Sequence, residues 1–203
     1  MNHSEIAASL ELELDWCAKM IDAAIKLYFG QDCAYSDVHA IEAPDLSKHA
    51  SPYASLIQQN QLGSSERLVV ILALAPHLRP QMLDTFLIKN SVTGRGFTEF
   101  GGIPDRLYGG FYPTIETAAF ILAGTSLEQR LAFIELFNSD SIFYRQQILE
   151  IPAAERSNQG TDTLFSAPLK IHPDQLTYIL TGKKTVPVFS VDFPAQQIKT
   201  ALT

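Results

Sequence analysis

Residues 63–124 contain the segments that decide the predicted fold. They open with GSSERLVVILALAPHLRPQMLDTFLIKN (63–90), continue through EFGGIPDRLYGGFYPT (99–114) and close with IETAAFILAG (115–124). The apolar run LVVILALA has the length of a strand, but the cap-like SSER before it and its alanine content favour a helix buried on most sides. We therefore expect three buried helices around one glycine-rich loop.

Prolines and glycines set the expected limits of these helices. Pro76 and Pro80 bracket a turn after the first helix, and Pro80 fits the first turn of the second. Pro113 and Thr114 start the third helix, which ends at Gly124. The expected buried positions of the second helix are Met82, Leu83, Phe86 and Leu87.

A long helix is predicted ahead of this stretch, at residues 4–28. Its apolar residues recur at steps of three and four, which places them in one buried stripe, and Gly30 ends the helix. Trp16 and Met20 lie beside the stripe. Core positions are favoured for both residues over contact with a partner.

Residues 31–62 are polar and weakly patterned, so we expect a connector packed on the surface, with one short helix in YASLIQQNQ (53–61). The same segment contains the nearest approach to a metal-binding pattern. Its residue types suit a divalent ion, but it lacks a helical His-x-x-x-His pair, and a solvated acidic loop is the favoured interpretation. The four residues concerned are Asp37, His39, Glu42 and Asp45.

Beyond Gly124 the pattern predicts one more helix and then a change of period. Ser126 is expected to cap the helix. The segments ILEIP (148–152) and LFSAPLKI (164–171) are typical of a β-pair, and a short helix, DQLTYIL (174–180), follows them. The expected apolar face of the helix after Ser126 comprises Leu127, Leu131, Ile134, Leu136 and Phe137.

The predicted fold class is therefore mainly α, with a minor β component (α+β). Three helices, a further helix and a β-pair give the element order of a winged-helix-like domain with a small β-hairpin. We expect a helical N-terminal extension and connector at 1–62, the winged-helix-like domain at 63–182 and a linker at 183–203.

The charge and composition of the chain argue against nucleic acid and membranes as partners. The net charge is −7, of which residues 1–62 contribute −6 (nine acids, three bases) and residues 63–203 contribute −1 (thirteen acids, twelve bases). Clustered Lys and Arg are needed to contact phosphates, so nucleic acid is not expected as a partner. The chain has neither a signal-peptide pattern nor a run of about 18 apolar residues, so we expect a cytoplasmic protein without a membrane partner.

Six of the eleven glycines fall within the seventeen residues 94–110. Their spacing fits neither G-x-G-x-x-G nor G-x-x-x-x-G-K-[ST], and no strand precedes them, so phosphate binding is disfavoured. Arg106 and Tyr108, at the expected tip of this loop, are the residues proposed for partner contact, with a solvated loop tip as the alternative.

No catalytic, cofactor-binding or metal-ligating set is predicted elsewhere. Cys17 and Cys33 do not form a CxxC pair, and no G-x-S-x-G elbow is present. The segment around Gly182-Lys183 is not a P-loop, because Thr177 stands where the first glycine is needed and Lys184 where Ser or Thr is needed.

The element order also invites a DNA-binding interpretation. Base reading requires a recognition helix with polar and basic side chains on its exposed face. The matching segment, 114–123, offers Thr114, Glu116 and Thr117 and contains no Lys or Arg. A stand-alone winged-helix DNA-binding regulator is therefore the second hypothesis, behind a module for protein contact.

Several strings resemble the region ahead of the ATPase module in AAA+ ATPases associated with phage-tail-like contractile injection systems. The glycine-rich loop followed by Pro-Thr and an apolar helix is the most specific of them, whereas residues 1–62 match only as a helical lead-in. The resembling strings are SSERLVVILALAPHL (64–78), EFGGIPDRLYGGFYPTIETAAFILAG (99–124), PLKIHPDQLTYILTGK (168–183) and FSVDFPAQQIKTAL (189–202).

The resemblance implies a winged-helix-like N-terminal module without enzymatic activity of its own. Its expected role is to contact partner proteins, namely its own ATPase module and the subunits of the assembly. ATP and magnesium belong to the ATPase module, which would follow residue 203, so this segment is expected to bind neither. The sequence is accordingly interpreted as the first part of a longer protein, with a stand-alone relative of the family as the alternative.

Overall fold

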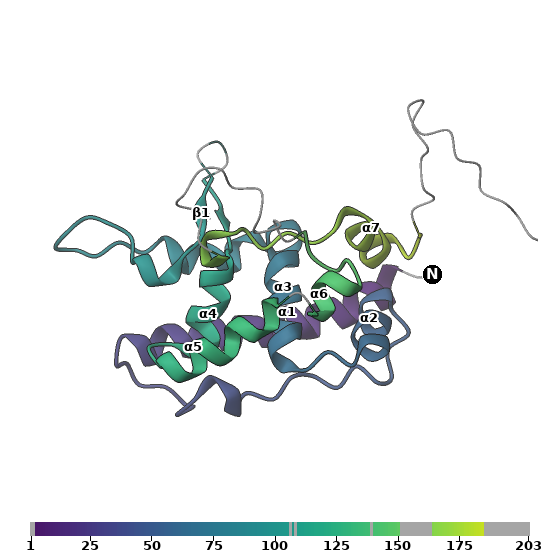
Figure 1. The fold of residues 1–203 in the computed structure, drawn as a ribbon, viewed down its shortest axis with the longest axis horizontal. Coiled ribbons are helices and arrows are strands. Elements are labelled where there is room, and N and C mark those ends of the chain that lie inside the picture. Colours follow the sequence, from purple (N-terminus) through teal and green to yellow (C-terminus); the bar gives the residue numbers. More distant parts are fainter. Residues whose placement is uncertain (1–2, 106, 108, 139, 151–163, 185–203) are drawn as a thin grey trace, which may run out of the picture.

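A computed structural model describes residues 3–105, 107, 109–138, 140–150 and 164–184. It is mainly helical, with one small antiparallel β-pair, which agrees with the coarse fold class predicted (Figure 1). The α-helices are α1 (His3–Tyr28), α2 (Pro52–Asn60), α3 (Ser64–Leu78), α4 (Ile115–Ala123), α5 (Leu127–Ile134), α6 (Ile142–Arg145) and α7 (Pro173–Thr181). Short 3-10 helices lie at Val38–Ala40, Pro80–Leu87, Thr98–Phe100, Glu135–Phe137 and Leu164–Ser166, and the strands are β1 (Ile103–Pro104) and β2 (Phe111–Tyr112).

Helix α1 runs along much of the length of the molecule and contacts α2, α3, α4 and α7 (Figure 1). Its predicted stripe is buried, as are Trp16 and Met20, so the core positions expected for both are confirmed. The other two central helices are α3 and α4, which contact each other and α1. Every residue from Leu68 to Ala75 is buried, which confirms the helix predicted from LVVILALA.

The turn expected between Pro76 and Pro80 is wrong, because α3 continues through Pro76 to Leu78. Proline removes one backbone donor, but a helix tolerates that loss near its end, and the N–H of Arg79 still donates to the carbonyl of Ala75 at 2.9 Å. Arg79 then separates α3 from the 3-10 helix that begins at Pro80. Of the positions predicted to be buried in that helix, Leu83 and Phe86 are fully buried, and Met82 and Leu87 are partly buried against the core.

The surface position expected for residues 31–62 is wrong in part, because α2 and several apolar side chains of this segment are buried. The short helix predicted there is present as α2, capped by Ser51, whose hydroxyl accepts the N–H of Ala54 at 3.1 Å. The apolar side chains of this segment join the same core as α1, α3 and α4. Those outside α2 lie on irregular backbone or in a single 3-10 turn, so their spacing shows no period. The buried ones are Val38, Ile41, Leu46, Tyr53, Ala54, Leu56, Ile57 and Leu62.

Among the described residues, the β-structure is smaller than predicted and lies partly elsewhere. β1 and β2 pair within the glycine-rich loop, with Ile103 opposite Tyr112 and Pro104 opposite Phe111. The predicted pair exists as one antiparallel bridge, Leu149 with Ile171, flanked by hydrogen bonds from Glu150 N–H to Lys170 O and from His172 N–H to Ile148 O. The connection at 153–163 and the linker from 185 onward lie outside the described residues.

Glycine 102 holds the glycine-rich loop against the start of α4. Its φ is +77°, and a Cβ placed there would lie 1.9 Å from Cζ of Phe111. Its N–H donates to Oγ1 of Thr114, the N-cap of α4, at 3.0 Å. Close backbone packing therefore fixes the loop at Gly102, where only glycine is small enough.

The apolar face predicted for α5 is wrong at its start. Ser126 caps the helix as expected, and Phe137 is buried, but Leu127 and Leu131 are 70% and 58% exposed. Helix α5 instead turns Phe133 into the core. Arg130 pairs with Glu116 of α4 and stands over the ring of Phe165, 4.2 Å from its centroid. These contacts set the rotation of α5 and leave the two leucines in solvent.

Candidate functional site

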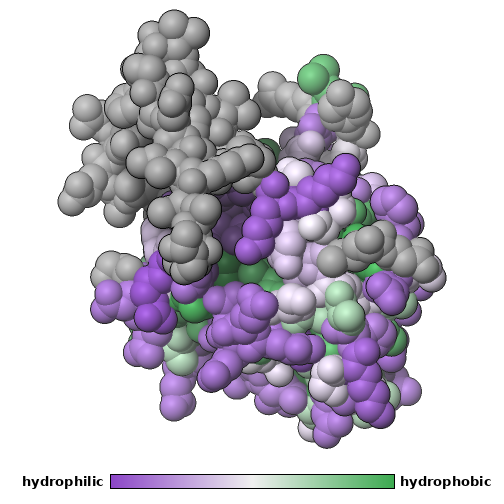
Figure 2. All heavy atoms as spheres, turned by 90° about the vertical axis from the view of Figure 1, so that its right-hand side faces the viewer, coloured by the Kyte–Doolittle hydropathy of each residue, from purple (hydrophilic) through white to green (hydrophobic). Residues whose placement is uncertain are grey.

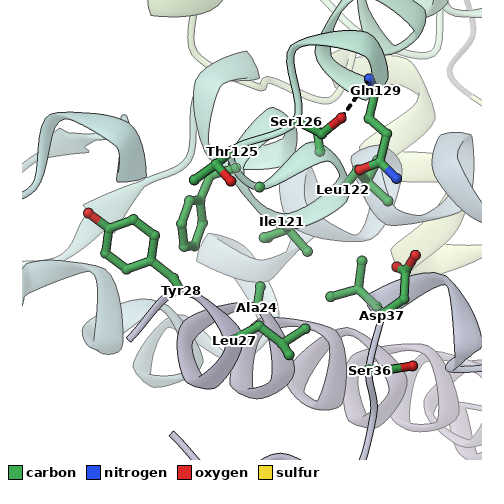
Figure 3. A pocket seen from close by; sticks show the side chains of 14 residues that line it. Ala24, Leu27, Tyr28, Ser36, Asp37, Ile121, Leu122, Thr125, Ser126 and Gln129 are labelled. Carbon is green, nitrogen blue, oxygen red and sulfur yellow. Dashed lines mark hydrogen bonds between the residues drawn. The ribbon is translucent and has the colours of Figure 1, made fainter. Parts of the chain in front are cut away.

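Two adjoining hollows form a groove between α5, the end of α4 and residues 36–39. The first, of about 360 Å³, lies over the C-terminal part of α1 (Figure 3). The second, of about 170 Å³, continues along α5. Both hollows are lined by Leu122 and Gln129, so they form one feature, which we call the α5 groove.

The floor of the α5 groove is apolar and its edges are polar. Ala24 and Leu27 rise into the first hollow from α1, and Ile121 lies above them on α4 (Figure 3). In the same view, Gln129 from α5 and Asp37 from the opposite wall point toward each other. The second hollow is lined by His39, Ser65, Leu122, Gln129, Ala132, Phe133 and Leu136.

His39 and Asp37 build the wall that faces α5. Oδ1 of Asp37 accepts the N–H of His39 at 2.9 Å and so caps the 3-10 helix at Val38–Ala40. Nε2 of His39 lies 2.9 Å from the carbonyl oxygen of Leu122. That carbonyl belongs to the last turn of α4, where helix geometry supplies no partner, so His39 satisfies it by donating.

Asp37 and His39 belong to the metal-like pattern of the sequence, and these hydrogen bonds give both residues a structural role. A third member, Asp45, accepts the N–H of Ser47 at 2.8 Å, and this hydrogen bond is the main cause of the lowered pKa of Asp45. Within the described part of the chain, no three His, Cys, Asp or Glu side chains are grouped so that they could hold a metal ion.

Tyr28 fixes one end of the α5 groove. Its hydroxyl donates to Oε1 of Glu99, and this bond raises the pKa of Tyr28 and lowers that of Glu99. Four phenylalanine rings surround Tyr28 with centroid separations between 4.9 and 6.1 Å. They are Phe29, Phe97, Phe100 and Phe120. The end of α1 is therefore held tightly against the glycine-rich loop and α4.

A buried ionic cluster joins α1 to α2 and α3. Glu13 is fully buried, accepts a hydrogen bond from the hydroxyl of Tyr53 at 2.9 Å and forms an ion pair with Arg67. Arg67 also donates to the carbonyl of Pro44 at 2.7 Å and lies 5.8 Å from the ring centroid of Trp16. Desolvation of the carboxylate raises the pKa of Glu13 despite these partners.

This cluster was not predicted from the sequence. The available signal was position. Glu13 precedes the buried Leu14 and stands four residues before the buried Cys17, on the buried side of α1. Arg67 likewise directly precedes eight buried residues of α3. The cluster ties α1, α2, α3 and the segment near Pro44 together, which is a structural role.

The residues proposed for partner contact, Arg106 and Tyr108, lie outside the described residues. Leu107 between them is 89% exposed.

Cys17 is fully buried, and burial raises the pKa of its thiol well above the usual range, whereas Cys33 is partly buried. Neither thiol forms a disulfide. Thr181 and Gly182 simply end α7, with Gly182 as its C-cap.

The helix considered for base reading has no exposed polar face. Thr114 and Thr117 of the 114–123 segment are buried at 2% and 0% exposure, and Glu116 is paired with Arg130. A recognition helix must present such side chains to the major groove. The burial of α4 therefore weighs against the DNA-binding hypothesis.

A third hollow, of about 430 Å³, lies between α2 and α7 but is mainly polar. Its lining residues include Gln59, Asn60, Asp174 and Gln175. From this end of the molecule, the described surface is largely hydrophilic, with smaller apolar areas (Figure 2). The α5 groove differs in its apolar floor and in the exposed leucines of its helix, which makes it the stronger candidate for binding another molecule.

None of the helices in the described ranges combines the length and apolar character needed to cross a membrane. Comparisons of the chain with protein-family models, with curated proteins and with solved structures each gave no match.

Proposed function

We propose that this chain is a non-catalytic module of an AAA+ ATPase of the kind associated with phage-tail-like contractile injection systems. In this proposal it works in the cytoplasm and contacts its own ATPase module and subunits of the assembly. The support from the sequence is the set of resembling strings. Those within the described residues pack together, since α3 contacts α4, and Leu169 N–H donates to Pro113 O at 2.9 Å.

A winged-helix-like arrangement of residues 63–182 is part of the proposal. Its support is the order of α3, the 3-10 helix at Pro80–Leu87, α4 and α5, followed by the antiparallel bridge between Leu149 and Ile171. An experimental structure that traces residues 151–163 tests it. The expected result is a hairpin that extends this bridge, and a helix or an unpaired loop there would remove the wing.

The observation that carries protein contact is the exposed apolar side of α5. Leu127 and Leu131 are four residues apart, so they lie on the same side of the helix, and both are more than half exposed. Helix α5 thus carries exposed apolar groups on one flank and borders the groove with the other, and both features are typical of surfaces that bind other proteins. We infer that α5 and its groove form the contact surface.

The test uses the protein encoded by the complete reading frame that contains these residues. Purified protein is assayed for ATP hydrolysis and for binding to the subunits encoded beside it. The double change Leu127→Glu with Leu131→Glu is expected to abolish subunit binding and to leave ATP hydrolysis intact. The matched control is Leu12→Glu, since Leu12 is 42% exposed on α1.

Two results would overturn the proposed function. One is a complete reading frame that encodes no nucleotide-binding module. The other is ATP hydrolysis by purified residues 1–203 themselves, with contaminating ATPases excluded, because it would show that the chain is catalytic.

A further inference from the structure

The α5 groove has the layout of a receptor for two successive side chains. Its hollows share Leu122 and Gln129, so they follow one another along α5. Side chains three or four residues apart on a helix project from one face as neighbours. A partner helix laid along the groove therefore places one side chain in each hollow, as in other helix-in-groove complexes.

The second hollow suits an aliphatic side chain. Leu122 and Phe133, both buried, and the partly buried Leu136 supply its apolar lining. Ala132 borders it from the exposed surface of α5, and its small side chain leaves the hollow open. An aliphatic group that enters this hollow removes its own apolar surface and that of the lining from water, so its burial is favourable.

The first hollow suits a side chain with an apolar stem and a cationic end. Leu27 and Ile121 offer apolar surface to the stem. The exposed carboxylate of Asp37 stands at the edge of the hollow and points into it (Figure 3). Lysine and arginine combine a hydrocarbon stem with a charged head in this way, and a carboxylate binds that head by charge-assisted hydrogen bonds.

The charge around the groove has one sign. Segments 36–42 and 125–138 contain four carboxylates and one permanent base, Arg130, and that base is already paired with Glu116. Glu128 and Glu135 are exposed and seven residues apart, which puts them on one side of α5 and its 3-10 extension, between the groove-lining Ala132 and the exposed Leu131. The surface is therefore complementary to a cationic partner.

We propose that the α5 groove binds a basic amphipathic helix of a partner protein, with an aliphatic side chain in the second hollow and a lysine or arginine in the first. This inference rests on the proposed function, because it names the partner chemistry of the same contact surface. Further lysines or arginines of the partner helix face Glu128 and Glu135.

The test is a selection from a displayed library of helical peptides in which the positions of one helix face are fully randomised. Residues 1–203 serve as the target, and the Ala132→Trp variant serves for counter-selection, because its indole fills the second hollow from an exposed position. Selected peptides are then synthesised and their affinity is measured by fluorescence anisotropy.

We expect the selected sequences to combine an aliphatic residue with Lys or Arg three or four positions away. Their affinity should fall by about tenfold or more with Ala132→Trp and by about tenfold with Glu128→Lys plus Glu135→Lys. The matched control, Glu5→Lys plus Glu11→Lys, makes the same charge change on exposed acids near the other end of α1, and should alter affinity less than about twofold.

Selection of acidic or uncharged sequences, equal binding to the Ala132→Trp variant, or no enrichment at all would each overturn this inference. These outcomes are separate from failure of the proposed function. If no basic helix is selected but Leu127→Glu with Leu131→Glu still abolishes subunit binding, only the partner chemistry is wrong. If a basic helix binds the groove but the reading frame encodes no ATPase, the ATPase assignment is wrong and the docking inference stands.

Discussion

Nε2 of His39 lies 2.9 Å from the carbonyl oxygen of Leu122, and this contact joins the 3-10 helix at Val38–Ala40 to the last turn of α4. It closes one wall of the α5 groove, since both residues line the second hollow. The contact links segments that are 83 residues apart in sequence. A single imidazole therefore determines where residues 36–40 lie on the surface.

Replacement of His39 by alanine should lower the free energy of unfolding by about 1 kcal/mol, because the Leu122 carbonyl loses its donor. Hydrogen exchange of the backbone amides at 38–41 should speed up as well. His39→Gln, which retains a donor of similar reach, should restore part of the loss. His77→Ala is the control, since His77 is exposed on α3, and an equal effect there would show that the contact contributes nothing specific.

Gly102→Ala should destabilise the fold by more than about 2 kcal/mol, because the methyl group meets the ring of Phe111 and φ is positive. Gly109 also has a positive φ, +70°, but a Cβ there meets nothing within 4 Å. Gly109→Ala should therefore cost only the backbone strain, about 1 kcal/mol. Urea unfolding of both variants measures the difference, and equal losses would contradict the close packing of Gly102 on Phe111.

Glu13→Gln should destabilise the protein by about 1–3 kcal/mol, because Tyr53 and Arg67 both donate to the side chain and the amide offers one acceptor oxygen in place of two. Glu11→Gln, an exposed change on the same helix, should alter stability by less than about 0.5 kcal/mol. Chemical unfolding at pH 7 provides the comparison. A small effect of Glu13→Gln would mean that Arg67 finds other partners.

The pH dependence of the same cluster has a defined sign. Burial raises the pKa of Glu13 above 4.5, so the folded state binds the proton more tightly than the unfolded state. The stability advantage of the wild type over Glu13→Gln should therefore shrink as pH rises from 4.5 through the raised pKa. Glu99, whose pKa is lowered, should show the opposite trend against Glu99→Gln, with the wild type gaining as pH rises toward and past 4.5. Unfolding measured from pH 3 to 8 tests both signs, and parallel trends would be inconsistent with them.

The orientation of α5 can be tested through stability alone. Leu131→Glu should change the free energy of unfolding by less than about 0.5 kcal/mol, because Leu131 is 58% exposed. Phe133→Ala, two residues along, should cost about 3 kcal/mol, since that ring is 5% exposed. Thermal unfolding measures both variants. A large loss for Leu131→Glu would restore the apolar face predicted from sequence.

Local signals predicted the long regular elements well. Sequence patterns predicted the buried stripe of α1 and the apolar run that forms α3, as well as the helix end at Gly30 and the cap at Ser126. They did so because backbone propensity and hydrophobic period agree at these positions. The face of α5 was not, because Leu127 and Phe133 both fit an apolar pattern, and the choice between them is made by Arg130 and its contacts with Glu116 and Phe165. Those contacts span segments that are distant in sequence.

The α5 groove could not be predicted from the sequence, because it too is formed by segments that are distant in sequence. Its walls come from α1, residues 36–39, α4 and α5, and the sequence gives no spacing rule that brings His39 to Leu122. The acids near His39 were instead considered as metal ligands. The buried pair of Glu13 and Arg67 was hidden by composition, since charged residues are assigned to the surface unless a partner is known.

The helices that bury α1 are synthesised well after it, which matters while the chain is being made. The apolar stripe of α1 is buried by α3 and α4, and α4 ends only at Ala123. A ribosome adds about 5–20 residues per second, so the stripe emerges roughly 5–20 s before its last covering helix. During that interval the nascent chain presents this apolar stripe uncovered, and chaperones that bind such surfaces have time to act on it.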